Sequence, residues 1–89
     1  MPSQNMTARM YFDQGRQSFG QREYDSAADL FKKAIDSDPK FDEAHRYLAE
    51  SYEKLGYRHR ALKAWEALLR VTTEAAAKEE INRRIAAVK

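Results

Sequence analysis

Apolar residues recur at helical spacing almost from end to end of this chain, and that periodicity favours an all-helical fold over any other. Five segments carry it, at about residues 5–20, 23–37, 41–55, 58–71 and 74–88. Residues that stop helices stand at the end of the first segment, at Gly20, and in the later gaps, at Asp38, Pro39, Gly56, Thr72 and Thr73. Glycine adopts the left-handed backbone that often ends a helix, and proline lacks the amide proton that would continue one. No segment alternates as a strand does, so we predict an all-α domain of about five helices.

Short polar side chains mark two of the expected helix starts. Asp25 and Ser26 lie at the beginning of the second segment, and Thr73 precedes the last one. Their side-chain oxygens can accept hydrogen bonds from the free amides of a first helical turn, so we expect them to act as N-caps.

The size and composition of the chain restrict it to a single small domain. It has 89 residues, of which 43% are hydrophobic and 34% charged, and it has no cysteine. So short a chain buries only a modest core, which leaves no room for a separate catalytic lobe. Without cysteine there are no disulfides, thiolate metal sites or cysteine nucleophiles. No apolar run nears the roughly 20 residues that span a bilayer, and the N-terminus lacks a signal-peptide core, so we expect a cytoplasmic protein without membrane contact.

The charge is nearly balanced overall but unevenly distributed. The formal net charge is +2, with an excess of acids over residues 25–53 and of bases over residues 54–89. A basic end can steer an acidic partner or nucleic acid toward a protein. Because acids are interleaved through the basic stretch and no nucleic-acid-binding pattern appears, we favour a solvated helical surface and expect no nucleic-acid partner.

A weak internal repeat relates the two halves of the chain. Residues 8–41 align with residues 42–75 at a shift of 34, with identity at a single position but with agreement in residue size at several inward positions. The matching pairs are Ala27 with Ala61, Gly15 with Ala49, Phe31 with Trp65 and Ile35 with Leu69. This pattern predicts two similar helical hairpins, in which small residues let the helices approach closely and an aromatic ring fills the space beyond.

With these residues the chain resembles the tetratricopeptide repeat family, whose unit is also 34 residues long. The first unit supplies Tyr11, Gly15, Tyr24, Ala27, Phe31, Ala34 and Pro39, and the second supplies Leu48, Ala49, Tyr52, Gly56, Ala61 and Trp65. Departures from the family pattern are Gln14, Ser18, His45, Leu68 and Thr73. The resemblance implies one domain over residues 1–89, built as a short right-handed solenoid of antiparallel hairpins: repeat one at 8–41, repeat two at 42–75 and a capping helix at 76–89.

The resemblance also implies a non-enzymatic scaffold that binds a protein or peptide in a concave groove. The residues expected there are Arg9, Phe12, Arg16, Phe19, Arg46, Tyr47 and Glu50. Phe12 and Phe19 would be the apolar anchors, with Arg16 and Arg46 as polar grips, on a face separate from an inward stripe of Tyr11, Gly15 and Ser18. In the alternative arrangement, neighbouring helices shade the two phenylalanines and Arg16 pairs with Glu50.

A second hypothesis is structural self-assembly with no separate ligand. Met6 and Met10 lie on the N-terminal helix, on the side that no preceding repeat would cover. Two hairpins and a cap are also fewer than the roughly three repeats that a stable solenoid usually needs. Such a short array can bury its exposed end by self-association or against a larger host protein, and we favour a homodimer in which another copy covers these methionines.

The sequence offers no constellation of catalytic or metal-binding residues. His45 and His59 are the only histidines, and neither has a carboxylate at ligand spacing. His45 is expected to pack inside its own hairpin, whereas His59 is flanked by arginines in a cationic setting that disfavours a metal ion. There is also no glycine-rich phosphate loop or nucleophile elbow. We therefore expect neither enzymatic activity nor a cofactor.

Overall fold

Five helices make up most of residues 5–89, the part of the chain that the computed structural model describes. They are α1 (Met6–Gly20), α2 (Tyr24–Ser37), α3 (Asp42–Leu55), α4 (Arg58–Val71) and α5 (Ala75–Val88). Over these residues there is no strand. The predicted all-α class is confirmed, and each helix begins and ends within about one residue of its expected bounds.

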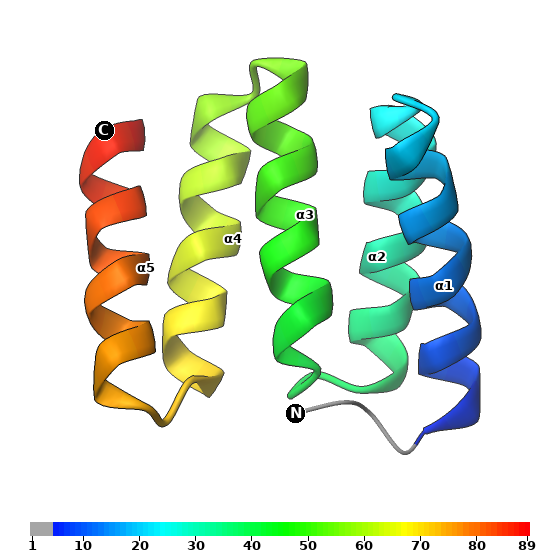
Figure 1. The fold of residues 1–89 in the computed structure, drawn as a ribbon, viewed down its shortest axis with the longest axis horizontal. Coiled ribbons are helices and arrows are strands. Elements are labelled where there is room, and N and C mark those ends of the chain that lie inside the picture. Colours follow the sequence, from blue (N-terminus) through cyan, green and yellow to red (C-terminus); the bar gives the residue numbers. More distant parts are fainter. Residues whose placement is uncertain (1–4) are drawn as a thin grey trace.

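The helices form a row of antiparallel hairpins, each packed on the next (Figure 1). Beyond these neighbours, only α1 and α3 bring their backbones close together among the described helices. Short connections enforce the antiparallel order, because they leave no length for a crossover. The arrangement exposes one side of α1 at one end of the row and one side of α5 at the other.

Close packing of α1 on α2 depends on a glycine facing an aromatic ring. A Cβ atom added to Gly15 would lie 2.7 Å from Cε1 of Phe31, which is too close for any real side chain. Phe31 itself is fully buried, as are Trp65, Ala49 and Ala61 in the second hairpin. The predicted combination of small residues and large rings in the core is therefore confirmed.

The buried stripe of α1 differs from the expected one. Its buried residues are Ala8, Phe12 and Gly15, whereas Tyr11 and Ser18 are only half-buried. Both stripes contain Gly15, but a step of one residue turns a helix by about 100°. The observed stripe faces both α2 and the start of α3, whereas the expected stripe was based on packing against α2 alone.

Two of the helix starts lack the side-chain caps expected for them. The N-cap of α2 is Glu23 and that of α5 is Glu74, and neither makes a side-chain capping bond. Asp25 lies inside α2, as does Ser26, so the capping predictions for these residues and for Thr73 are wrong. The side-chain cap that is present belongs to α1, where Asn5 Oδ1 accepts from the amide of Ala8 at 3.0 Å.

The left-handed positions also fall partly elsewhere. Gly56 has φ +79° and ends α3, as the sequence predicts. After α1 the residue with positive φ is Arg22, at +63°, while Gly20 stays helical. The chain thus ends α1 with a backbone conformation that glycine adopts more easily than arginine does.

Candidate functional site

A polar hollow lies between α1, α3 and α5. A cavity of about 550 Å³ is lined by Phe19, Glu50, Glu53, Lys54 and Arg84. Among the residues expected to bind a partner, Phe19 and Glu50 therefore share one cavity. Arg84 of α5 and Glu53 of α3 were not among the predicted residues.

Phe12 does not line this hollow, because it belongs to the core. It is 5% exposed, and its ring lies 4.7 Å from that of Phe41 and 5.7 Å from those of Phe31 and Tyr47, measured between centroids. Rings from α2, from α3 and from the loop before α3 thus cover it on several sides. Phe12 is therefore not available as the exposed anchor that the sequence suggested.

Phe19 and Arg16 are more accessible than Phe12. Phe19 is half-buried, with its ring edge-on to Tyr24 and to Tyr47 at centroid distances of 5.2 and 5.4 Å. The exposed Arg16 extends over Tyr47, with its guanidinium carbon 6.0 Å from the ring centroid. Arg16 makes a cation–π contact rather than the ion pair with Glu50 that the alternative arrangement required.

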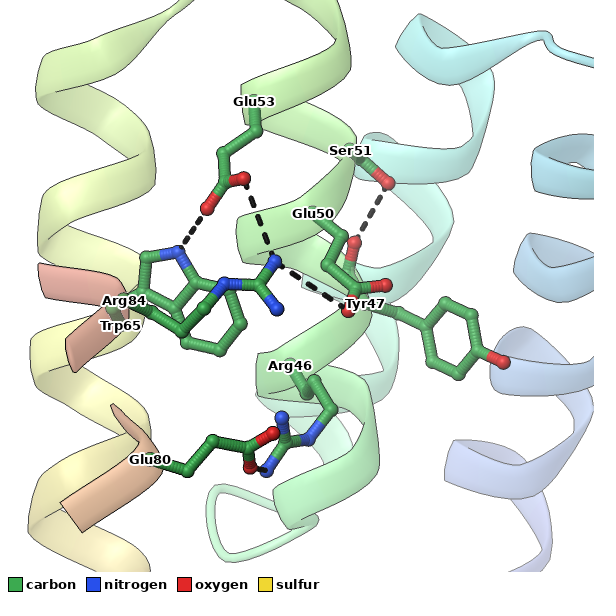
Figure 2. Close-up of polar contacts among 8 residues, drawn as sticks. All are labelled: Arg46, Tyr47, Glu50, Ser51, Glu53, Trp65, Glu80 and Arg84. Carbon is green, nitrogen blue, oxygen red and sulfur yellow. Dashed lines mark hydrogen bonds and ion pairs between the residues drawn. The ribbon is translucent and has the colours of Figure 1, made fainter. Parts of the chain in front are cut away.

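Arg46 and Glu50 instead form ion pairs with residues of α5 (Figure 2). Arg46 lies 3.1 Å from Glu80, and Arg84 lies 3.9 Å from Glu50 and 3.5 Å from Glu53. Arg46 and Glu50 are one turn apart on α3, and Glu80 and Arg84 are one turn apart on α5 with the charges reversed. That reversed order was a signal in the sequence that could have identified the contact.

Trp65 is the centre of this network. It is fully buried, its indole nitrogen donates to Glu53, and the guanidinium carbon of Arg84 lies 4.6 Å from the ring centroid. Arg46 also lies against the same ring, at 5.8 Å. The contacts of Arg46, Glu53, Glu80 and Arg84 in Figure 2 therefore link α5 to α3 and α4, so this part of the predicted binding surface is occupied by contacts within the chain.

The imidazole of His45 is buried and has a hydrogen-bond partner inside the fold, as expected for a packing residue. It is 6% exposed, and its Nε2 donates to the carbonyl oxygen of Pro39 at 2.7 Å. Nowhere in residues 5–89 do three or more His, Asp or Glu side chains gather so as to hold a metal ion. None of the helices in that range combines the length and apolarity needed to cross a bilayer.

The open side of α1 carries the most exposed apolar side chains. Met6 is 85% exposed and Met10 is 48% exposed, and the one other large hydrophobic side chain in this class among the described residues is Tyr57. The two methionines lie one turn apart on a helix that packs against neighbours on its other side only. Arg9, also expected to bind a partner, is exposed on the same helix.

Comparison with known protein families gives a match that covers most of the chain. The model of a family described as alkyl sulfatase dimerisation matches residues 5–78, which is most of the chain. No curated protein sequence matches it significantly. The expectation that the chain is a tetratricopeptide repeat protein is therefore wrong. Small residues facing large rings are needed wherever two helices pack closely, so the pattern does not distinguish one family of hairpins from another.

Proposed function

Because the chain belongs to the alkyl sulfatase dimerisation family, we propose that it is a self-association module that joins two copies of the protein carrying it. The family match over residues 5–78 is the observation that carries this proposal. It favours self-assembly over the docking of a separate peptide. That the module has no enzymatic activity and is cytoplasmic remains a prediction from the sequence.

We further propose that the two copies meet through the open side of α1. Met6 and Met10 supply exposed apolar area there, and methionine side chains adapt readily to a facing surface. Gln14 and Gln17 on this side are uncharged, and the exposed Arg9 and Asp13 beside the methionines carry opposite charges, which a two-fold interface can pair between the copies. Among residues 5–89, α1 packs on α2 and α3 only, so its outer side faces no other helix.

Peptide docking in the hollow between α1, α3 and α5 has weaker support. The proposed anchor Phe12 is buried, and Arg46 is paired with Glu80. Phe19 offers only a small apolar area there, and the exposed Arg16 already lies over the ring of Tyr47. Interfaces usually depend on a few well-packed anchors, and this hollow keeps only one of the two expected.

The α1 interface is tested by placing charges on it. In the double variant Met6→Glu with Met10→Glu, two carboxylates from each copy would meet in the interface, so we expect the dimer to dissociate at least about tenfold more readily. Sedimentation equilibrium measures the change. The matched control is Ala76→Glu with Asn82→Glu, which adds the same charge to exposed positions on α5. Equal association of both variants and the unmodified chain would locate the interface elsewhere.

A further inference from the structure

A second cavity, of about 500 Å³, lies between α2 and α4 over another face of α3. We call it the back groove. Its floor consists of His45, Leu48 and Tyr52 of α3, and its walls are Lys32 and Ile35 of α2 with Arg60, Lys63, Ala64 and Ala67 of α4. Because its lining comes from α2, α3 and α4, it is separate from the open side of α1 where we place the dimer interface.

The floor of the back groove is mostly apolar. Leu48 is 8% exposed and Tyr52 is 9% exposed, so both present part of their surface to the cavity. The ring of His45 is already hydrogen-bonded to the carbonyl oxygen of Pro39. On the α4 wall, Ala64 and Ala67 are small and leave room above this floor. The cavity therefore suits large apolar side chains from a partner.

The charged residues of the back groove are all cations. Lys32, Arg60 and Lys63 are exposed, and the lining includes no carboxylate. None of the three forms an ion pair with another described residue. The acids nearest to them along the same helices are Asp29, Asp36 and Glu66, which lie outside the lining. The groove thus has an excess of positive charge that the chain itself does not pair.

These cations stand on both walls and toward both ends of the groove. The walls, α2 and α4, run in the same direction (Figure 1). Lys32 corresponds to Glu66 at the 34-residue shift between the hairpins, so it lies level with Ala67 of the facing wall. Arg60 and Lys63 border the other end, and the lining of α4 spans about 10 Å at 1.5 Å per residue. Positive charge therefore borders the apolar floor along its length.

We propose that the back groove docks an acidic amphipathic helix of another protein. Apolar side chains of that helix pack on Leu48 and Tyr52, and carboxylates on either side of its apolar stripe reach Lys32 on one wall and Lys63 on the other. A second copy of this chain is a poorer occupant, because a two-fold contact through this face opposes like charges. The proposal does not depend on the proposed dimerisation.

The surroundings of the groove favour a helix over an extended peptide or a nucleic acid. Its walls and floor are helices, whose backbone groups bond within each helix, so an extended peptide would find few backbone partners there. A docked helix satisfies its own backbone and presents side chains alone. Phosphates would neutralise the cations but leave the apolar floor uncovered, and Tyr52, the one aromatic residue of the lining, is buried rather than open to base stacking.

The test is a titration of the full chain, labelled with ¹⁵N, with a synthetic peptide of about 15 residues, long enough for an isolated helix. The peptide has leucines at helical spacing, glutamates on both sides of that stripe and alanine elsewhere. One comparison peptide has lysine in place of every glutamate, and another has the same composition in an order without a stripe. We expect the acidic amphipathic peptide to shift the amide resonances of Leu48, Tyr52 and Ala67, with an affinity about tenfold above the lysine peptide and about fivefold above the scrambled one.

Several results of this titration would overturn the proposal. Absence of binding would do so, and equal affinity for the scrambled peptide would show attraction by charge alone. Shifts centred on Phe19 and Glu50 would place the peptide in the polar hollow instead. Back-groove shifts that appear on raising the protein concentration without peptide would make a second copy the occupant. Binding of a single-stranded oligonucleotide at these amides when the peptide does not bind would make it a nucleic-acid site.

A pair of double variants tests the charges of the groove. Lys32→Gln with Lys63→Gln removes one cation from each wall and should weaken binding of the acidic peptide about fivefold. The matched control, Lys78→Gln with Arg83→Gln, removes the same charge from exposed positions on α5 and should change the affinity less than twofold. An equal loss in both would contradict a specific site.

A substitution on the α4 wall tests the apolar contact without changing the charge. Ala67→Gln places an amide where the docked helix excludes water, so it should weaken binding at least about threefold. Ala76→Gln, at an exposed position on α5, is the control and should leave the affinity as it is. Both variants should keep the helical circular dichroism spectrum. Unchanged binding by Ala67→Gln would show that the partner does not enter the groove.

Discussion

Individual backbone positions determine how closely the helices of this chain can pack. A Cβ at Gly15 would lie 2.7 Å from the ring of Phe31, whereas nothing lies within 4 Å of one at Gly20. We predict that Gly15→Ala lowers the free energy of unfolding by roughly 1–2 kcal/mol, because the overpacking exceeds the gain in helix propensity. Gly20→Ala should leave that free energy unchanged or raise it by up to about 1 kcal/mol. Urea denaturation measures both, and equal effects would show that the ring of Phe31 moves freely.

The two left-handed positions give a second pair of opposed substitutions. Arg22 has φ +63° and Gly56 has φ +79°. We predict that Arg22→Gly raises the free energy of unfolding by up to about 1 kcal/mol, because it relieves a conformation that costs other residues about 1–2 kcal/mol. Gly56→Ala should lower the free energy of unfolding by about 1 kcal/mol. Open space surrounds that residue, so the cost comes only from placing alanine in a left-handed backbone conformation. Thermal denaturation of both variants checks the signs, and destabilisation by Arg22→Gly would mean that its side chain matters more than its backbone.

Single residues were also where the sequence was hardest to interpret. The spacing of Phe12, Arg16 and Phe19 predicts a shared face but does not say whether that face meets solvent or another helix. Phe12 is buried because Phe41 and Tyr47, about 30 residues later, cover it. A contact at that separation leaves no local signal, whereas the contact of Gly15 with Phe31 follows from small and large residues at hairpin spacing.

At the level of whole helices, α5 is held by charge more than its apolar stripe suggests. Arg84 lies over Trp65 and near Glu50 and Glu53. We predict that Arg84→Met, which keeps the length of the side chain, destabilises the docking of α5 by about 1 kcal/mol. Faster amide hydrogen exchange in α5, with exchange in α1–α3 unchanged, measures this loss.

The neighbouring Arg83→Met is the matched control for that variant. Arg83 is exposed on the same helix and makes no ion pair with a described residue. Its replacement should leave exchange in α5 as it is. Trp65 is the only tryptophan, so its fluorescence gives a second readout that should respond to Arg84→Met alone. Similar responses to both variants would show that the ion pairs do not hold the helix.

The bounds of the helices were the most predictable feature of the fold. Periodicity, Gly56 and Pro39 are local signals, and they located all five helices. The caps were less predictable, because several polar residues stand near each helix start and tertiary packing decides which of them enters the helix. The contact of α5 with α3 needed a comparison of charges between two distant helices, although Arg46, Glu50, Glu80 and Arg84 carried it in the sequence.

For the molecule as a whole, the sequence predicted an array of hairpins but not its family. The 34-residue agreement reflects how two closely packed hairpins must be built, and proteins of different families meet the same requirement. The exposed end of the array was the more informative feature, since it raised self-association independently of the family match. It left the open side of α1, with Met6 and Met10, as the surface that we propose another copy covers.

The most direct test of self-association is the molar mass of the unmodified chain in solution. Light scattering after size exclusion, over a wide range of protein concentration, measures it without labels or variants. We predict a mass of twice the 10.4 kDa of one chain, decreasing toward the monomer only on dilution. A mass of 10.4 kDa that persists at the highest concentration would contradict the proposed dimer.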